Sequence, residues 1–485
     1  RRALPRAGAR RPRGRMASAA RRPGRRWGTA GLLGLAPALL QVVAGAKGKD
    51  VRPITIERVF KTNLERRLSA SLEAGVRHLA WAFGIVEAEG EAGHPAAAFG
   101  AYELELEGGL WRTDCESSLN YGRDRVHLCA LHKMTALAAL CEAGGNNSEW
   151  KQPLRSLLRR LVGPKMDTPV AGLGLKRWKV GSPGDRTEVW LSEVEPGSGK
   201  FDLNLAIHAA VTLAVAQCDL SLGQRDHLDD LRNWLAALKH VHPQKAWGEQ
   251  HFHSNGVIWE AAALVADSLP DGSEFAGAAR ELADQLQAFS AAELIRLPTA
   301  WSFSAARAAA LSLRRPGLKP SRRKQLAKSA SKFFGRFVGM APRFGSGANG
   351  SQQAVSDTFT CGPLQGAAPL ALALLPPGPR GAPPLPELQV ALLLGLATKD
   401  METFQVNATA SSGVSQVAGR LREAQLLQRP SLAGAFLRDA MQLRGEKRSS
   451  LRVDDTAHCV LALARTLELL RALDAAEPVV APAGG

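Results

Sequence analysis

The first 46 residues contain no aspartate or glutamate, although they contain eleven arginines. The whole chain of 485 residues has a formal net charge of +17, so the 439 residues after this segment carry only +6. A surplus of that size is ordinary for a chain of this length. The overall basicity therefore does not predict a nucleic-acid partner.

Several short motifs of well-known enzyme classes are also missing. The chain has no P-loop, no Rossmann glycine pattern, no G-x-S-x-G sequence and no paired C-x-x-C. These absences argue against P-loop nucleotide hydrolysis, a Rossmann dinucleotide site, an α/β-hydrolase nucleophile and a zinc ribbon. We therefore expect no cofactor.

The arginine-rich segment has the layout of a secretory signal. From Met16 it runs through "RRPGRRW" and the apolar "GLLGLAPALLQVVAGA", and Ala44 and Ala46 stand as in an A-x-A cleavage site. We expect residues 1–46 to comprise upstream residues and a signal peptide that is removed. An uncleaved signal anchor is the alternative, because residues 28–46 approach the ~20 needed to cross a bilayer. No later segment is predicted to span a membrane.

Sequons and cysteines fit a secreted glycoprotein. Three glycosylation sequons begin at Asn146, Asn349 and Asn407. The six cysteines are even in number but sparse, so one or two disulfides are expected, with a connectivity that the sequence does not reveal. Cys129 and Cys141 are predicted on one helix, about 18 Å apart, and so cannot pair with each other.

The remaining sequence has a strongly helical periodicity. Alanine-rich apolar helices are predicted to begin at Asp124, Asp202, Ser254, Ser302, Ser356 and Asp454, and several are followed by a more charged amphipathic helix. Two short alternating runs near 172–192 predict one β-hairpin. We expect a helical or extended segment over 47–120 and an all-α domain over 121–485 that includes this hairpin.

Apolar helices alternating with amphipathic ones imply two layers, since a helix without a polar face must be enclosed. Together with a spacing near fifty residues, this pattern over about residues 120–475 resembles the α/α-toroid proteins, which include many carbohydrate-active enzymes and the terpene cyclase-like proteins. An open α-solenoid fits the pattern too. In a toroid, the segments that lead into the inner helices gather at one end.

These leading segments supply the candidate site residues. The predicted catalytic residues are Glu249, His251, His253, Asp202, Asp357 and Asp455, and the predicted substrate-binding residues are Tyr121, Arg123, Asn204, Asn255 and Trp301. For Asp124, Asp202, Ser302 and Asp357, capping of the following helix is by itself a sufficient reason for the residue type.

The stretch "WGEQHFHSN" is the strongest candidate. Glu249, His251 and His253 alternate, so in an extended segment they point to one side. A carboxylate and an imidazole could share acid and base roles on a glycosidic bond or a uronate C5 proton. The alternatives are a solvated polar loop without a chemical role, and a metal held by His251 and His253.

The stretch "RVDDTA", residues 452–457, resembles the end of the Asp-Xaa-Asp-Asp-Thr-Ala proton-donor motif of class II terpene cyclases. Arg452 stands where that motif has its first aspartate, so a carboxylate is missing. Capping of the following helix by Asp454 or Asp455 is the structural alternative.

A basic stripe is predicted farther along the chain. Lys324, Lys328, Lys332 and Arg336 recur every four residues, opposite apolar positions of the same predicted helix. The stripe could bind an anionic polysaccharide or an anionic membrane surface, or it could be a solvated helix face.

Taken together, these patterns predict a secreted protein that acts on glycan, as a glycoside hydrolase or polysaccharide lyase. A non-catalytic helical-repeat binding protein is the alternative, and a terpene cyclase-like protein a remote one.

Overall fold

The structure is a computed structural model. The residues that it describes belong to one compact unit, Ile54–Gly485. They are residues 58–86, 103–105, 110–112, 118–121, 124–127, 129–181, 187–194, 197–241, 252–268, 277–285, 287, 303–315, 317–340, 361–375, 390, 393–397, 405–406, 432–436 and 450–476. This part of the chain is mostly helical, with small antiparallel sheets.

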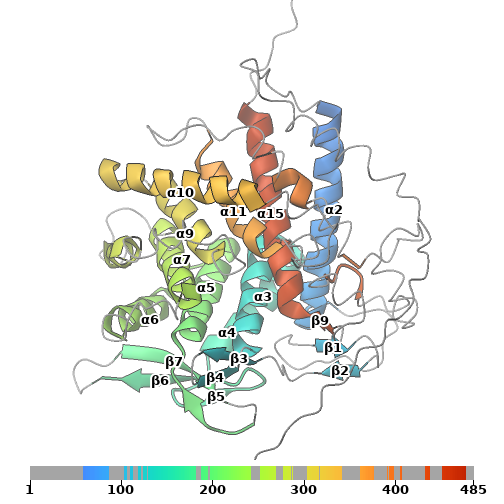
Figure 1. Cartoon of the computed structure of the whole chain (residues 1–485). Coiled ribbons are helices and arrows are strands. Elements are labelled where there is room, and N and C mark those ends of the chain that lie inside the picture. Colours follow the sequence, from blue (N-terminus) through green and yellow to red (C-terminus); the bar gives the residue numbers. More distant parts are fainter. Residues whose placement is uncertain are drawn as a thin grey trace, which may run out of the picture. The chain divides into compact units, whose positions relative to one another are not determined.

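Six apolar helices pack on one another in chain order. They are α3 (Cys129–Gly144), α5 (Leu205–Leu222), α7 (Phe252–Ser268), α9 (Phe303–Arg314), α11 (Cys361–Ala373) and α15 (Val453–Ala476). Each packs against the next, and α15 packs against α3 as well as α11 (Figure 1). Their side chains are largely buried all round, as expected of helices enclosed by others.

Helices α15 and α3 run in the same direction. Near the start of both, His132 of α3 lies beside Asp454 of α15. About three turns later, Glu142 of α3 pairs with Arg465 of α15. Contacts that advance together along two helices can occur only if the helices are parallel.

Three further neighbouring pairs show the same behaviour. In each, two contacts advance together along both helices: Cys141–Cys218 and Gly145–Ser221 for α3 and α5, Gly256–Ser304 and Glu260–Arg307 for α7 and α9, and Cys361–Cys459 and Gln365–Arg465 for α11 and α15. The N-terminal ends of these partners therefore lie together.

More polar helices cover this group. Helix α2 (Arg58–Ala82) packs on α15 and α3, α4 (Ser148–Val162) and α6 (Leu228–Val241) pack on α5, and α10 (Pro320–Met340) packs on α9. Helix α4 is typical, because it buries Leu154, Leu158 and Leu161 and exposes Arg159 and Arg160. The predicted alternation of buried and amphipathic helices is thus present.

The predicted hairpin is part of a larger sheet. Strands β5 (Pro169–Val170), β6 (Leu175–Val180), β7 (Thr187–Glu193) and β8 (Phe201–Asp202) form one antiparallel sheet in that order. Strand β7 backs onto α5 and α6, where Trp190 meets Trp234 edge to face with ring centroids 5.4 Å apart. The hairpin prediction is confirmed as β6 and β7.

The start of α3 differs from the prediction. Asp124 does not begin that helix but lies in strand β4 (Asp124–His127), which pairs with β3 (Ser118–Tyr121). The helix begins at Cys129, because the preceding residues satisfy their backbone groups in this hairpin. A third sheet joins β2 (Leu110–Arg112), β1 (Glu103–Glu105) and β9 (Ser450–Arg452), so the strand before α15 pairs with one before α3.

One described helix, α5, is long and apolar enough to cross a bilayer, contrary to the expectation of none. Of its span, 78% is buried inside the protein, between α3, α7 and the outer helices. Such burial is typical of a core helix, and one helix of this kind is weak evidence for a membrane span.

Two disulfides join neighbouring helices in the part of the chain that the structure describes. They link Cys141 to Cys218 and Cys361 to Cys459, and are compatible with folding in an extracellular or secretory-lumen compartment. Asn146 is exposed just before α4, where a glycan could be attached. The predicted signal segment, Asn349 and Asn407 lie outside the described residues, so signal cleavage and glycosylation stay predictions.

Candidate functional site

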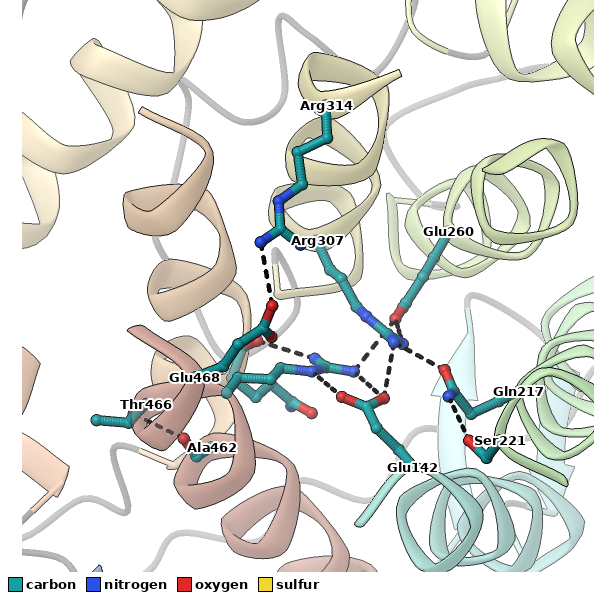
Figure 2. Close-up of polar contacts among 11 residues, drawn as sticks. Glu142, Gln217, Ser221, Glu260, Arg307, Arg314, Ala462, Thr466 and Glu468 are labelled. Atoms are coloured by element: carbon teal, nitrogen blue, oxygen red, sulfur yellow. Dashed lines mark hydrogen bonds and ion pairs between the residues drawn. The ribbon is translucent and has the colours of Figure 1, made fainter. Parts of the chain in front are cut away.

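Five of the six apolar helices place one polar side chain in a common buried network, and the sixth, α11, contributes a backbone carbonyl. The side chains are those of Glu142 of α3, Gln217 of α5, Glu260 of α7, Arg307 of α9 and Arg465 of α15, and the carbonyl is that of Gln365. Figure 2 shows the side chains converging between the helices. The network has two guanidinium groups and two carboxylates, so its charges balance.

Arg307 joins three of the helices to its own. Its guanidinium lies 2.7 Å from the carboxylates of both Glu142 and Glu260, and it donates a 2.7 Å hydrogen bond to the side-chain oxygen of Gln217. Gln217 in turn donates to Ser221, one turn later on α5. Burial alone would lower the pKa of Arg307, but the charges of Glu142 and Glu260 raise it above its usual value.

Arg465 forms the second centre of the network. It donates to both oxygens of Glu142, at 2.7 and 2.9 Å, and to the backbone carbonyl of Gln365 at 2.8 Å. Burial tends to raise the pKa of Glu142, but the charges of Arg307 and Arg465 outweigh it and hold the pKa below its usual value. Glu142 and Arg307 are therefore charged at neutral pH, and this arrangement supplies fixed electrostatics and not an acid–base pair.

A cavity of about 30 Å³ adjoins the network. It is lined by residues from all six helices, including Thr135, Val257, Ser304 and Leu461 beside the charged groups. This volume holds a water molecule but not a sugar ring. A sugar therefore does not fit in this cavity.

A second polar cluster lies where α3 and α15 begin. Arg452 Nη2 lies 3.1 Å and 3.0 Å from the two ring nitrogens of His132, and 2.8 Å from Asp454 Oδ2. His132 Nε2 lies 3.4 Å from the same carboxylate oxygen. All three side chains are largely buried, at 10%, 13% and 8% exposure for His132, Arg452 and Asp454.

The neighbouring helix start adds a further contact. Gln365 of α11 lies 2.9 Å from Nδ1 of His458, which is in the second turn of α15. An imidazole, a guanidinium and a carboxylate in contact at parallel helix ends can hold a proton and orient an anionic group. We call His132, Arg452 and Asp454 the α3–α15 cluster.

A third cluster joins the end of α5 to the start of α6. Asp219 accepts from His227 Nδ1 at 2.8 Å, from the His227 backbone and from Gln224. Burial tends to lower the pKa of His227, but its hydrogen bond to Asp219 and that carboxylate's charge raise it. Because Asp219 ties three groups of one turn together, its role is to hold the α5–α6 connection. A cavity of about 190 Å³ lies beside this turn.

The structure places only some of the predicted site residues. Glu249, His251, Trp301, Asp357 and Arg123 lie outside the described residues. Tyr121 lies in β3, and His253 and Asn255 lie in the first turn of α7, but their side chains are not described. His253 is thus helical and not extended. The prediction that its side chain points to the same side as Glu249 and His251 required an extended segment and does not hold for His253.

The remaining predicted residues are placed in full. Asn204 is the N-cap of α5, accepting hydrogen bonds from Ala206 and Ile207. Asp202 is therefore not the cap; it is exposed in β8 and accepts from Leu203. Asp455 is buried in the first turn of α15, next to the α3–α15 cluster in sequence. Neither Asp454 nor Asp455 is positioned before the helix, which begins at Val453.

The central network was not predicted from the sequence, although a sequence pattern marks it. Glu260, Arg307 and Arg465 are each a single charged residue in an apolar stretch, as in "IWEAAALV", "SAARAAAL" and "LALARTL". A buried charge requires a partner, so such residues on neighbouring helices are expected to meet.

Among the described residues, no group of three or more His, Cys, Asp or Glu is placed to hold a metal ion.

Comparison with known proteins adds no identification. No protein family, curated protein or solved structure matches this chain.

Proposed function

We propose that this protein is an α/α-toroid enzyme of the secretory pathway that acts on glycan, with its reaction centre at the N-terminal ends of the inner helices. The cyclic packing of the six helices supports the toroid, since the last packs on the first. So do the four parallel neighbouring pairs. In such a ring the segments that lead into the helices meet at one rim.

The observation that carries the proposal is the α3–α15 cluster. His132 has a ring nitrogen 3.4 Å from the Asp454 carboxylate, which can orient the imidazole and stabilise its protonated form. Arg452 opposes protonation of His132 and can bind a carboxylate of the substrate. Histidine is suited to exchange a proton near neutral pH, either with a glycosidic oxygen or with a uronate C5 carbon.

The leading segments complete the proposed site. Glu249, His251 and His253 remain its main acid–base candidates, with Asp202, Asp357 and Asp455 facing them across the rim. Tyr121, Arg123, Asn204, Asn255 and Trp301 are proposed to contact the sugar. Glycan as the substrate class is supported by the disulfides, which fit an extracellular or secretory location, and by analogy with other toroids.

The test is turnover of a polysaccharide panel, measured both as reducing ends released and as absorbance of unsaturated uronate. The variants are His132→Gln, Asp454→Asn and Glu249→Gln, and the control is Glu73→Gln, whose side chain on α2 is 71% exposed. Loss of a proton-transfer group is expected to lower kcat by about 10²–10⁴. Unchanged turnover in both His132→Gln and Asp454→Asn would remove the α3–α15 cluster from the mechanism.

A non-catalytic glycan-binding protein is the second candidate. It is favoured by the small size of the described cavity between the six helices, about 30 Å³, which is too small for a sugar. This alternative predicts glycan binding without turnover on any member of the panel. It also predicts that Glu249→Gln affects affinity and not product formation.

A further inference from the structure

The region around α10 has an unusual charge composition. Residues 301–356 contain eleven lysines and arginines and no acidic residue. A net positive surface of this density raises the local concentration of anions. The question is which of these charges are used within the fold and which are available to a partner.

The arginines near the start of α10 make contacts within the protein. Arg315 and Arg322 each lie 2.7 Å from a different oxygen of Asp284. Arg323 donates to the backbone carbonyl of Arg315 at 2.9 Å. Farther back on α9, Arg314 pairs with Glu468 of α15. These arginines therefore fasten α10 and α9 to their neighbours.

The lysines of α10 are arranged differently. Lys324, Lys328 and Lys332 are exposed and recur every four residues, so their side chains follow one face of the helix. None of them has an ion-pair partner among the residues that the structure describes. Leu326, Phe333 and other apolar side chains of α10 are buried on the opposite face, against α9. We call the three lysines the lysine face.

We propose that the lysine face is a binding site for an anionic glycan carrying sulfate or uronate groups, separate from the α3–α15 cluster. Three ammonium groups at steps of four residues span about 12 Å of helix, with about 6 Å between neighbours. A linear polymer with repeated negative groups can contact all three at once. The prediction that a polyanion binds depends only on the lysine face. The prediction that this polyanion is a glycan depends on the proposed function.

A membrane surface fits this face less well. Helices that bind membranes insert apolar side chains into the lipid beside their basic residues. In α10 the apolar side chains Leu326, Phe333, Phe334 and Phe337 are all buried in the protein core. Among the described residues, the lysine face therefore offers positive charge without an exposed apolar anchor beside it. This suits a soluble polyanion better than a membrane surface.

The experiment measures binding of the full chain to heparin, to hyaluronate and to vesicles of phosphatidylserine and phosphatidylcholine over a range of NaCl concentrations. The test variant is Lys324→Ser, Lys328→Ser and Lys332→Ser together. The matched control is Lys165→Ser, Lys179→Ser and Lys200→Ser together, which removes the same charge from exposed positions in and near the β5–β8 sheet. A third variant replaces the three α10 lysines by arginine.

We expect the test variant to bind heparin at least tenfold more weakly at low salt. Its slope of log K against log salt should be smaller by about two to three, since each lost contact releases fewer counterions. The control and arginine variants should stay within threefold of the wild type. Equal binding by the test and control variants would overturn the proposal, as would binding to the vesicles but not to heparin or hyaluronate. Loss of heparin binding in the test variant, with no glycan turnover by any protein, would support the lysine face while rejecting the proposed enzyme.

Discussion

His208 is an uncharged histidine inside the fold. Its Nδ1 accepts from the Trp190 backbone and its Nε2 lies 3.0 Å from the Trp234 carbonyl, so the proton is on Nε2. Burial lowers its pKa to about 4, despite the opposing effect of the hydrogen bond to Trp234. The side chain thus connects β7 and α6 through α5 only while it is neutral.

This pKa predicts loss of stability in acid. The unfolded chain binds a proton near pH 6.5 and the folded chain only near pH 4, so stability is full above pH 6.5 and falls as the pH drops through this window. The loss approaches roughly 3 kcal/mol. Urea unfolding between pH 7 and pH 4 should show it. His208→Gln should be less stable at pH 7 but change less with pH; an equally steep pH dependence would contradict this role.

The central network predicts a large cost for removing one charge. Among the described residues, Arg307→Met leaves the buried carboxylate of Glu260 with only Arg465, 3.8 Å away, as a charged partner. Removal of one partner from a buried ion pair typically costs about 3–5 kcal/mol. Thermal unfolding of Arg307→Met, Glu260→Met and the double variant measures the coupling. The double variant should be more stable than the sum of the single losses implies, and simple additivity would show that the two residues do not depend on each other.

At the level of elements, α5 depends on its N-cap. Asn204 accepts hydrogen bonds from two backbone amides that have no partner within the helix. Asn204→Ala should lower the free energy of unfolding by about 1 kcal/mol. Asp202→Ala, two residues earlier and exposed, should change it by less than about 0.5 kcal/mol. Chemical denaturation of both variants checks the assignment, and a larger loss for Asp202→Ala would reverse it.

The helices were predictable because apolar residues fill long stretches of sequence, and the β6–β7 hairpin because its polar and apolar residues alternate. The residues at which the helices begin were not predictable. Aspartate is a common N-cap residue, but Asp124 and Asp202 lie in strands β4 and β8 and pair with a neighbouring strand. Local preference cannot foresee a partner strand that is distant or unrecognised.

The candidate site was only partly predictable, for a related reason. Asp455 was identified from its position before a predicted helix, and it lies beside the α3–α15 cluster in sequence. His132 was not identified, because its neighbours Arg452 and Asp454 are 320 and 322 residues away. A contact across such a distance follows from the packing of α15 on α3, which periodicity alone does not specify.

For the whole molecule, the disulfide between Cys141 and Cys218 closes a segment with a sequence separation of 77 residues. Its loss as Cys141→Ala with Cys218→Ala should reduce the free energy of unfolding by about 2–4 kcal/mol, mainly because the unfolded chain gains freedom. Denaturant titration of the variant and the wild type, both without reductant, measures the difference. An unchanged midpoint would mean that the bond is not formed in the protein as produced.

The position of α15 between α3 and α11 has a consequence for synthesis. During translation Glu142 emerges more than 300 residues before Arg465, the residue that makes two hydrogen bonds to its carboxylate. The apolar sides of α2 and α3 that face α15 stay uncovered for that whole interval, and that of α11 stays uncovered from the time it is synthesised. Uncovered apolar surface makes such a nascent chain prone to aggregation until its last helix is made, and a stop codon before Val453 should yield a product that is degraded.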